Sequence, residues 1–157
     1  MPIGTRDMSS AHRTLNVQDY LRLRMLLARC QILRHDRMRG RQSLAPLKAP
    51  RMPASLARAT VGWFRNSLYL ASVHVLVENW DKCLAYDEAV CRLLAQRGCR
   101  SAVQEFRNSV FHTEALLDPQ NVRSRGRVQD LLRWADGVVD GVKTYFDTVP
   151  PPGLTPP

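Results

Sequence analysis

The sequence predicts an all-α protein, a compact bundle of about four to five helices with a basic N-terminal helical arm. Apolar residues recur at spacings of three and four along most of the chain, and no segment shows a strand pattern of any weight. With 157 residues and 45% hydrophobic content, the chain is sized for one domain with a substantial core. We predict a basic helix and a proline-containing linker over residues 1 to 53, a helical bundle over 54 to 148, and a disordered proline-rich tail over 149 to 157.

The first two helices lie on either side of the linker. The first is predicted over residues 16 to 39, where apolar side chains near helical spacing are interleaved with arginines. Three prolines between residues 45 and 53 cannot continue it. The second helix begins between residues 54 and 60 and ends near 81; its portion from 68 to 77 is apolar almost all round, which predicts a buried spine. The apolar residues of the first helix are Leu21, Met25, Leu26, Ala28, Ile32 and Leu33.

A short helix and a longer one follow. Residues 87 to 96 have an acidic start and a stop at Gly98, as a short helix requires. The pattern Ser101-x-x-Gln104 has the form of a capping box, so we expect a fourth helix to start there and to end near residue 118.

The last helix is predicted from Val128, after a polar loop over residues 120 to 126. Arg123, Arg125 and Arg127 lie in this loop or just beyond it, where they would either extend a groove for an RNA backbone or form a solvated surface. The apolar residues of the helix recur at three and four: Leu131, Leu132, Ala135, Val138, Val139, Val142 and Phe146.

The positive charge of the chain is concentrated near its N-terminus. The formal net charge is +9; residues 1 to 58 hold 12 Lys or Arg against 3 Asp, whereas residues 59 to 157 hold 11 basic against 11 acidic residues. Twenty of the 23 basic residues are Arg, whose forked donors suit phosphate. A codon bias towards Arg explains that ratio equally well, so the arm is either a nucleic-acid contact or a solvated basic face.

Composition also bears on location and cofactors. The first twelve residues lack the apolar centre of a signal peptide, and the longest apolar run, residues 68 to 77, is too short to span a bilayer. We therefore expect a cytoplasmic protein without membrane contact. The four cysteines form no C-x-x-C pair, so we expect reduced thiols, no metal site and no cofactor.

The strongest candidate for a functional site is a group of polar residues in the fourth helix. Arg107, Asn108 and His112 place a cation, an amide and an imidazole together, and in a helix Asn108 and His112 share one face. Metal-independent RNA cleavage needs these groups: an imidazole to move protons, a cation to meet the phosphate and an amide to orient either. The competing interpretation is that they are surface residues of an ordinary helix.

Spacing alone is weak support for such a site. Arg6 precedes His12 and Arg29 precedes His35 at a similar interval. The Arg107 segment differs because Asn follows Arg directly and because three apolar residues, Phe106, Val110 and Phe111, can bury one side of the helix and hold the polar side in place.

The segment Phe106-Arg-Asn-x-Val-Phe-His112 resembles the signature of HEPN domains. A second segment, residues 67 to 80, resembles the helix that lies upstream in some bacterial HEPN-like proteins of uncharacterised role, with its Leu-Tyr, Glu and Trp. The resemblance covers about residues 60 to 147. It implies a helical bundle, usually a homodimer with both motifs facing an interface cleft, and often ribonuclease activity without metal.

The resemblance also implies roles for the motif residues. Arg107 would contact the scissile phosphate, Asn108 would be its polar partner, and His112 would act as general acid or base, leaving 2′,3′-cyclic phosphate ends. One His per chain cannot easily do both jobs, so a dimer would supply two copies of His112. HEPN proteins serve as toxins or defence components, some with an antitoxin partner, and many are inactive RNA-binding or dimerisation modules.

One position departs from the family pattern. Some HEPN toxins are neutralised by modification of a Tyr two residues after the His, where this chain has Glu114. That departure argues against this mode of neutralisation and leaves the nuclease interpretation intact. His74 and Glu78, four residues apart on the predicted spine, would either form a hydrogen-bonded core pair or lie under the site.

Overall fold

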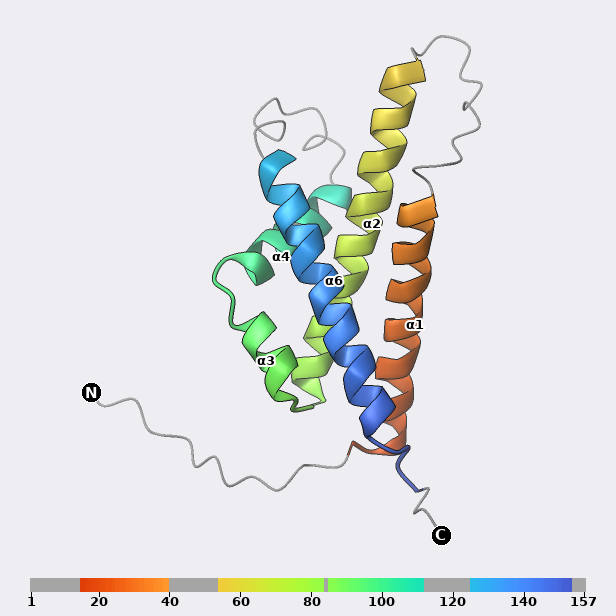
Figure 1. Cartoon of the computed structure of the whole chain (residues 1–157), viewed down its shortest axis with the longest axis vertical. Helices are drawn as coiled ribbons and strands as arrows, with labels where there is room; N and C mark the ends of the chain where they lie inside the picture. The colour runs from red at the N-terminus through yellow and green to blue at the C-terminus, as the bar shows by residue number, and fades with distance from the viewer. Residues whose placement is uncertain (1–14, 40–53, 84, 112–124, 154–157) are drawn as a thin grey trace, which may run out of the picture.

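The computed structural model describes residues 15–39, 54–83, 85–111 and 125–153. They contain five helices and no strand, so the all-α helical bundle is confirmed (Figure 1). No helix among these residues is both long and apolar enough to cross a membrane. The helices are α1 (Val17–Arg39), α2 (Ala54–Lys82), α3 (Glu88–Leu94), α4 (Cys99–Phe111) and α6 (Arg125–Thr148).

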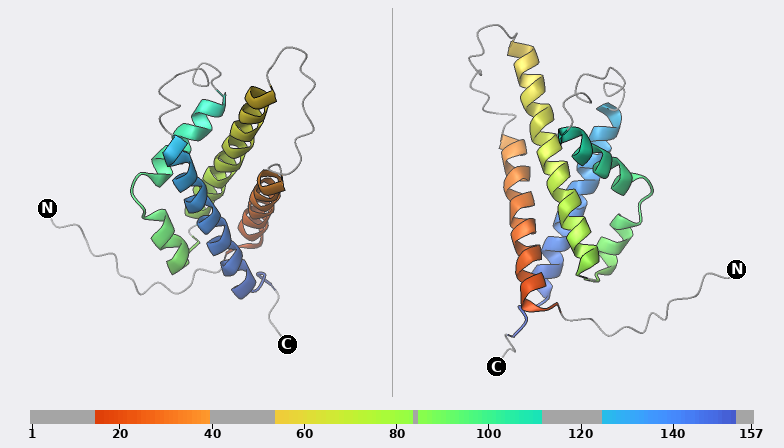
Figure 2. Two further views of the ribbon diagram at one scale, coloured as in Figure 1. Left: turned by 45° about the horizontal axis from the view of Figure 1, so that its top comes forward. Right: turned by 180° about the vertical axis from the view of Figure 1, so that it is seen from behind.

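Helix α2 is the spine of the bundle, as its sequence predicts. Its residues Tyr69, Leu70, Val73 and Leu76 have no exposed surface, and Trp80 is only 2% exposed. Helices α1, α4 and α6 all pack against α2, and every view shows α2 between α1 and α4 (Figures 1 and 2). A helix segment that is apolar almost all round is kept from water only when its neighbours cover more than one of its faces, and these three helices do so.

Helix α1 belongs to the same core. The sequence left open whether the N-terminal helix folds onto the bundle or extends from it. Asn16 caps the helix by accepting a hydrogen bond from the backbone N–H of Asp19 at 2.8 Å. Tyr20, Leu23 and Leu27 are buried against the bundle, and the ring of Tyr20 meets that of Phe146 on α6 edge to face.

The row of α1 that is buried is not the row that the apolar spacing emphasised. Leu21, Met25 and Ile32 are exposed, whereas Tyr20 and Leu23 are buried. The helix carries two apolar rows on opposite faces, and periodicity alone does not rank them. The row that faces the core continues into two arginines with partners on α6.

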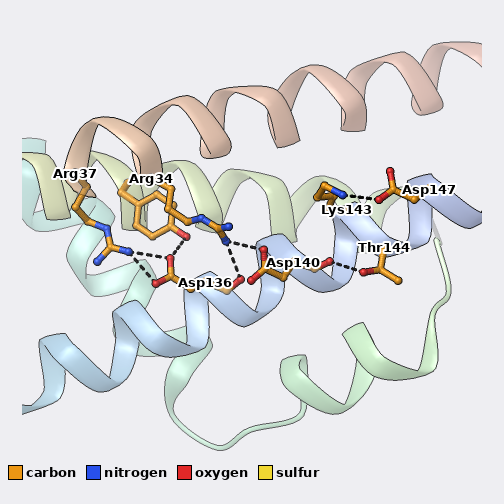
Figure 3. Close-up of polar contacts among 8 residues, drawn as sticks. Arg34, Arg37, Asp136, Asp140, Lys143, Thr144 and Asp147 are labelled. Carbon is orange, nitrogen blue, oxygen red and sulfur yellow. Dashed lines mark hydrogen bonds and ion pairs between the residues drawn. The ribbon is translucent and has the colours of Figure 1, made fainter. Parts of the chain in front are cut away.

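Those two arginines tie α1 to α6 (Figure 3). Arg37 donates two hydrogen bonds to Asp136, at 2.8 and 2.9 Å, and Arg34 lies 2.7 Å from Asp140. The hydroxyl of Tyr69 on α2 donates to Asp136 at 2.7 Å. Burial, together with the hydrogen bond to Asp136, raises the pKa of Tyr69, which therefore stays protonated as a donor. Part of the N-terminal charge excess is thus neutralised inside the bundle.

The start of α3 follows the sequence signal, whereas its end does not, because the helix ends at Leu94, four residues before Gly98. The start of α4 also differs from the expected one. Asp87 caps α3 by accepting from the N–H of Val90, and the chain then turns at Gly98 with a φ of 81°, in the left-handed region that favours glycine. Helix α4 already begins at Cys99, so Ser101 lies inside the helix and is not its cap. Its hydroxyl donates to the carbonyl of Gly98 at 3.2 Å.

The last helix also begins earlier than predicted. Residues 125 and 126, which were expected in a loop, belong to α6, and residues 120–124 lie outside the described residues. Helix α6 then packs on α1, α2, α3 and α4, and the indole N–H of Trp134 donates to the carbonyl of Leu93 at 2.8 Å.

Candidate functional site

Arg107 lies in the last turns of α4 and faces α2. Its Nη1 is 3.4 Å from Nε2 of His74 and 3.6 Å from Oε1 of Glu78. The same imidazole nitrogen lies 3.3 Å from that carboxylate oxygen. The three side chains therefore form one cluster between α2 and α4, in which each member lies within 4 Å of the other two.

The α2 half of the cluster follows from helical spacing. His74 and Glu78 are four residues apart, so they lie one above the other on a single face of α2. His74 is only 8% exposed because it lies within the buried apolar segment of α2. Nε2 of His74 is within reach of both partners: it donates to Glu78 in one tautomer and accepts from Arg107 in the other.

The surroundings of His74 favour the neutral form of its imidazole. Burial lowers the pKa of His74 and Arg107 lowers it further, while Glu78 acts in the opposite direction by its charge and hydrogen bond. Burial is the largest of these effects because the folded chain removes water from the charged imidazolium. The cluster thus holds one cation, one anion and a neutral imidazole.

Arg107 is held in place but is still open to solvent. Its side chain is 39% exposed and that of Glu78 is 37% exposed, whereas the His74 side chain is 10% exposed. A guanidinium has five N–H donors, and among the described residues only Nη1 is engaged with these partners. Within the described part of the chain, the other donors are therefore left for an anion such as a phosphate.

Of the predicted site residues, the structure describes Arg107 with its side chain and Asn108 by its backbone only. Asn108 is part of α4. Outside the described residues lie His112, Arg123 and the side chains of Asn108, Arg125 and Arg127. The contact between Arg107 and His112 on which the site depends is therefore still a prediction.

The sequence singled out each member of the cluster, but it did not predict that the three side chains contact one another. The i, i+4 spacing of His74 and Glu78 in an apolar run marked them as a core pair or as residues under a site. Their pairing with Arg107 depends on how α4 is rotated against α2, which the spacing within either helix does not encode.

No metal-binding group of three or more His, Cys, Asp or Glu side chains occurs in the part of the chain that the structure describes. Comparison of the chain with family models, curated proteins and solved structures gave no match.

Proposed function

We propose that the chain is a metal-independent endoribonuclease of the HEPN type. The observation that supports this most directly is the position of Arg107, the cation of the motif: it is fixed by His74 and Glu78 and still exposes part of its guanidinium. A cation held in place beforehand stabilises a phosphate that gains charge better than a mobile one does, because no reorganisation is needed during the reaction.

The reaction is transesterification followed by release of the 5′-hydroxyl strand. Arg107 binds non-bridging oxygens of the scissile phosphate. The ribose 2′-oxygen attacks phosphorus, its proton passes to a neutral imidazole, and the bond from phosphorus to the 5′-oxygen breaks as that oxygen receives a proton from an imidazolium. His112 is the residue assigned to proton transfer, and Asn108 orients the phosphate or the imidazole.

A homodimer supplies what one chain lacks. Two proton transfers require two acid–base groups in opposite protonation states, and a site shared between two copies provides two His112 side chains. Arg123, Arg125 and Arg127 would bind the RNA backbone on either side of the cleaved bond. In this proposal the protein acts in the cytoplasm as a toxin or defence component, which an antitoxin protein holds in check.

A second candidate is an RNA-binding or dimerisation module without turnover. One observation favours it: the Arg107 guanidinium already has two polar partners on α2, as an arginine that only joins two helices would. In that case Arg107 stabilises the bundle, and RNA binds without being cut.

The chain offers a matched control that separates the two candidates. Arg100 also lies on α4 and forms an ion pair with Asp81 on α2, at 3.0 Å and with similar exposure, so Arg100→Ala removes a comparable link between the same helices. Purified parent, Arg107→Ala, His112→Ala and Arg100→Ala proteins are incubated with structured and unstructured RNA in excess chelator, and the products are examined for 2′,3′-cyclic phosphate ends.

We expect the parent and Arg100→Ala to cleave, and Arg107→Ala and His112→Ala to lose cleavage by about a hundredfold or more. RNA binding without cleavage by the parent would favour the module. Equal cleavage by all four proteins would exclude Arg107 and His112 as catalytic residues and point to a contaminating nuclease.

A further inference from the structure

The outer face of α1 carries an apolar row that the described residues leave uncovered. Val17, Leu21, Met25 and Ile32 are 53%, 55%, 70% and 68% exposed, and Ala28 between them is also exposed. Spacings of four, four, three and four keep these five residues on one face of the helix, opposite the buried row. We call them the α1 apolar row; it is about 24 Å long.

Arginines border this row. Arg22 and Arg29 are seven residues apart along one side, and Arg39 follows the row at the end of α1. Arg24 lies on the other side, where its guanidinium packs over the rings of Tyr20 and Phe146. All four are exposed, and none forms an ion pair with another described residue. Arg34, by contrast, faces the bundle and is paired with Asp140. The outer face of α1 is therefore apolar in its centre and positively charged at its borders.

The acidic residues of the bundle are already engaged. Of the described acidic residues, Glu105 alone has no such partner, while Asp19 and Asp87 take part in helix capping. The carboxylates that form ion pairs are Asp36, Glu78, Asp81, Glu88, Asp130, Asp136, Asp140 and Asp147. The described residues therefore offer few free carboxylates with which to neutralise the outer face of α1.

We propose that the outer face of α1 binds an acidic amphipathic helix of a partner protein. The apolar side of that helix packs along the α1 apolar row, with anchors at i, i+3, i+4 and i+7, and its Asp and Glu residues meet Arg22 and Arg29. Aliphatic side chains on both helices exclude water, and the charges at the borders set the orientation. This proposal is independent of the proposed ribonuclease activity.

Charge argues against the other molecules or segments that could cover this face. A second copy of α1 packed on the row would place arginines beside arginines, which is unfavourable. The neighbouring segments 1–14 and 40–53 contain five Lys or Arg and one Asp, so they bring no complementary charge. RNA would be attracted to the arginines, but the row lacks the aromatic side chains on which bases stack.

The probe is a labelled synthetic helix of about 20 residues with Leu and Ile at heptad positions a and d and Glu at positions e and g. A second peptide has Lys in place of each Glu. Binding of both peptides to the full chain is measured by fluorescence anisotropy, beside a structureless RNA and vesicles of anionic lipid. Two variants form a matched pair: Ala28→Glu puts a carboxylate in the row, and Ala89→Glu puts one on an exposed position of α3.

We expect the acidic peptide to bind at least about tenfold more tightly than the basic peptide, and Ala28→Glu but not Ala89→Glu to weaken it by about tenfold or more. The double variant Arg22→Glu/Arg29→Glu should reverse the preference between the two peptides. The proposal is overturned if neither peptide binds, if both bind alike, if Ala28→Glu has no effect, or if light scattering shows a dimer that Ala28→Glu dissociates. Loss of RNA or vesicle binding in Ala28→Glu, without peptide binding by the parent, also overturns it.

Discussion

Nη1 of Arg107 lies 3.4 Å from Nε2 of His74, although the two residues are 33 positions apart in the chain. The contact joins the motif helix α4 to the spine α2. It places the strongest candidate cation of the chain beside an imidazole that burial keeps neutral. Repulsion between Arg107 and a neutral His74 is small, and 39% of the Arg107 side chain is exposed in the described part of the chain.

The first prediction concerns RNA affinity without cleavage. An RNA with 2′-O-methyl groups lacks the attacking hydroxyl, so its binding reports contacts alone. We expect Arg107→Ala to weaken binding and to reduce the magnitude of the slope of log affinity against log salt concentration by about 0.7, the effect of one lost phosphate contact on a single strand. Titrations at several salt concentrations, with Arg100→Ala as the control, measure this slope.

An unchanged slope in Arg107→Ala would show that Arg107 does not contact a phosphate. A difference in folding stability between Arg107→Ala and Arg100→Ala should not affect this comparison. Arg107 and Arg100 each form a half-exposed ion pair between α4 and α2, so either change should cost less than about 1 kcal/mol of unfolding free energy.

The second prediction concerns His74 and pH. Because burial lowers the pKa of His74 below its ordinary 6.5, the unfolded chain takes up this proton at a higher pH than the folded chain does. The resulting contribution to stability is present above pH 6.5, the unfolded value, and is lost as the pH falls below it and through the lower pKa of the folded chain. Urea denaturation should therefore show that the parent loses more stability between about pH 8 and pH 5 than His74→Gln does.

His35 provides the control for this measurement, since it is exposed on α1. The variant His35→Gln should follow the parent over the same range of pH. Equal pH dependence in the parent and in His74→Gln would mean that His74 is not held neutral in the folded chain.

The fold was predictable where one signal in the sequence dominates. The apolar run of residues 68 to 77 could only be buried, and α2 is the spine; Asp87 marks the start of α3 as expected. Gly98 does not mark the end of α3, which is at Leu94, but the turn before α4. Where two signals compete, the sequence does not decide between them. Helix α1 has two apolar rows, and the choice between them depends on Arg34 and Arg37 meeting α6, which is about 100 residues away in sequence.

The candidate site shows the same limit. Ser101 looked like a cap because Gln104 follows at the right interval, but the helix starts at Cys99 and the Ser101 hydroxyl bonds to Gly98 inside it. Arg107 could be identified from its neighbours in sequence. Its pairing with Glu78 could not, because tertiary packing alone sets which face of α4 meets α2.

The third prediction concerns the link between α1 and α6. Asp136 accepts hydrogen bonds from Arg37 and from the buried Tyr69, and the Arg37 side chain is only 11% exposed. Asp136→Ala leaves both donors without their partner in a poorly solvated place, so unfolding free energy should fall by about 3 kcal/mol. Asp147→Ala breaks an exposed pair with Lys143 on the same helix and should cost less than about 0.5 kcal/mol.

Urea denaturation of the two variants beside the parent gives these differences directly (Figure 3 shows both pairs). A similar, small loss in both variants would mean that water reaches Arg37 and Tyr69 freely, and that the contacts with Asp136 do not stabilise the association of α1 with α6.

The fourth prediction concerns two glycines of α6 that face α3. A Cβ on Gly137 would lie 3.4 Å from a methyl carbon of Leu93, an ordinary contact, whereas a Cβ on Gly141 would lie 3.1 Å from one of Val90, which is fully buried. Alanine favours a helix over glycine by about 1 kcal/mol. We expect Gly137→Ala to stabilise the chain by up to about that amount and Gly141→Ala to be the less stable of the two, because Val90 has little room to move.

Thermal or urea denaturation of both variants ranks them. If Gly141→Ala proved the more stable variant, α3 would have to be free to shift away from α6, and the close packing of α3 on this helix would not contribute to stability.

The last prediction concerns the reactivity of the thiols. Burial raises the pKa of Cys30 to about 12, and the side chain has no exposed surface, whereas Cys83, Cys91 and Cys99 are partly exposed. The thiolate is the reactive form, and a rise from 9.0 to about 12 reduces its fraction near neutral pH by about a thousandfold.

Iodoacetamide labelling followed by peptide mass spectrometry should therefore modify Cys30 last in the folded chain. In denaturant, all four thiols should react at similar rates. Early labelling of Cys30 under native conditions would show that α1 separates readily from the bundle, and its buried row would then contribute little to the stability of the core.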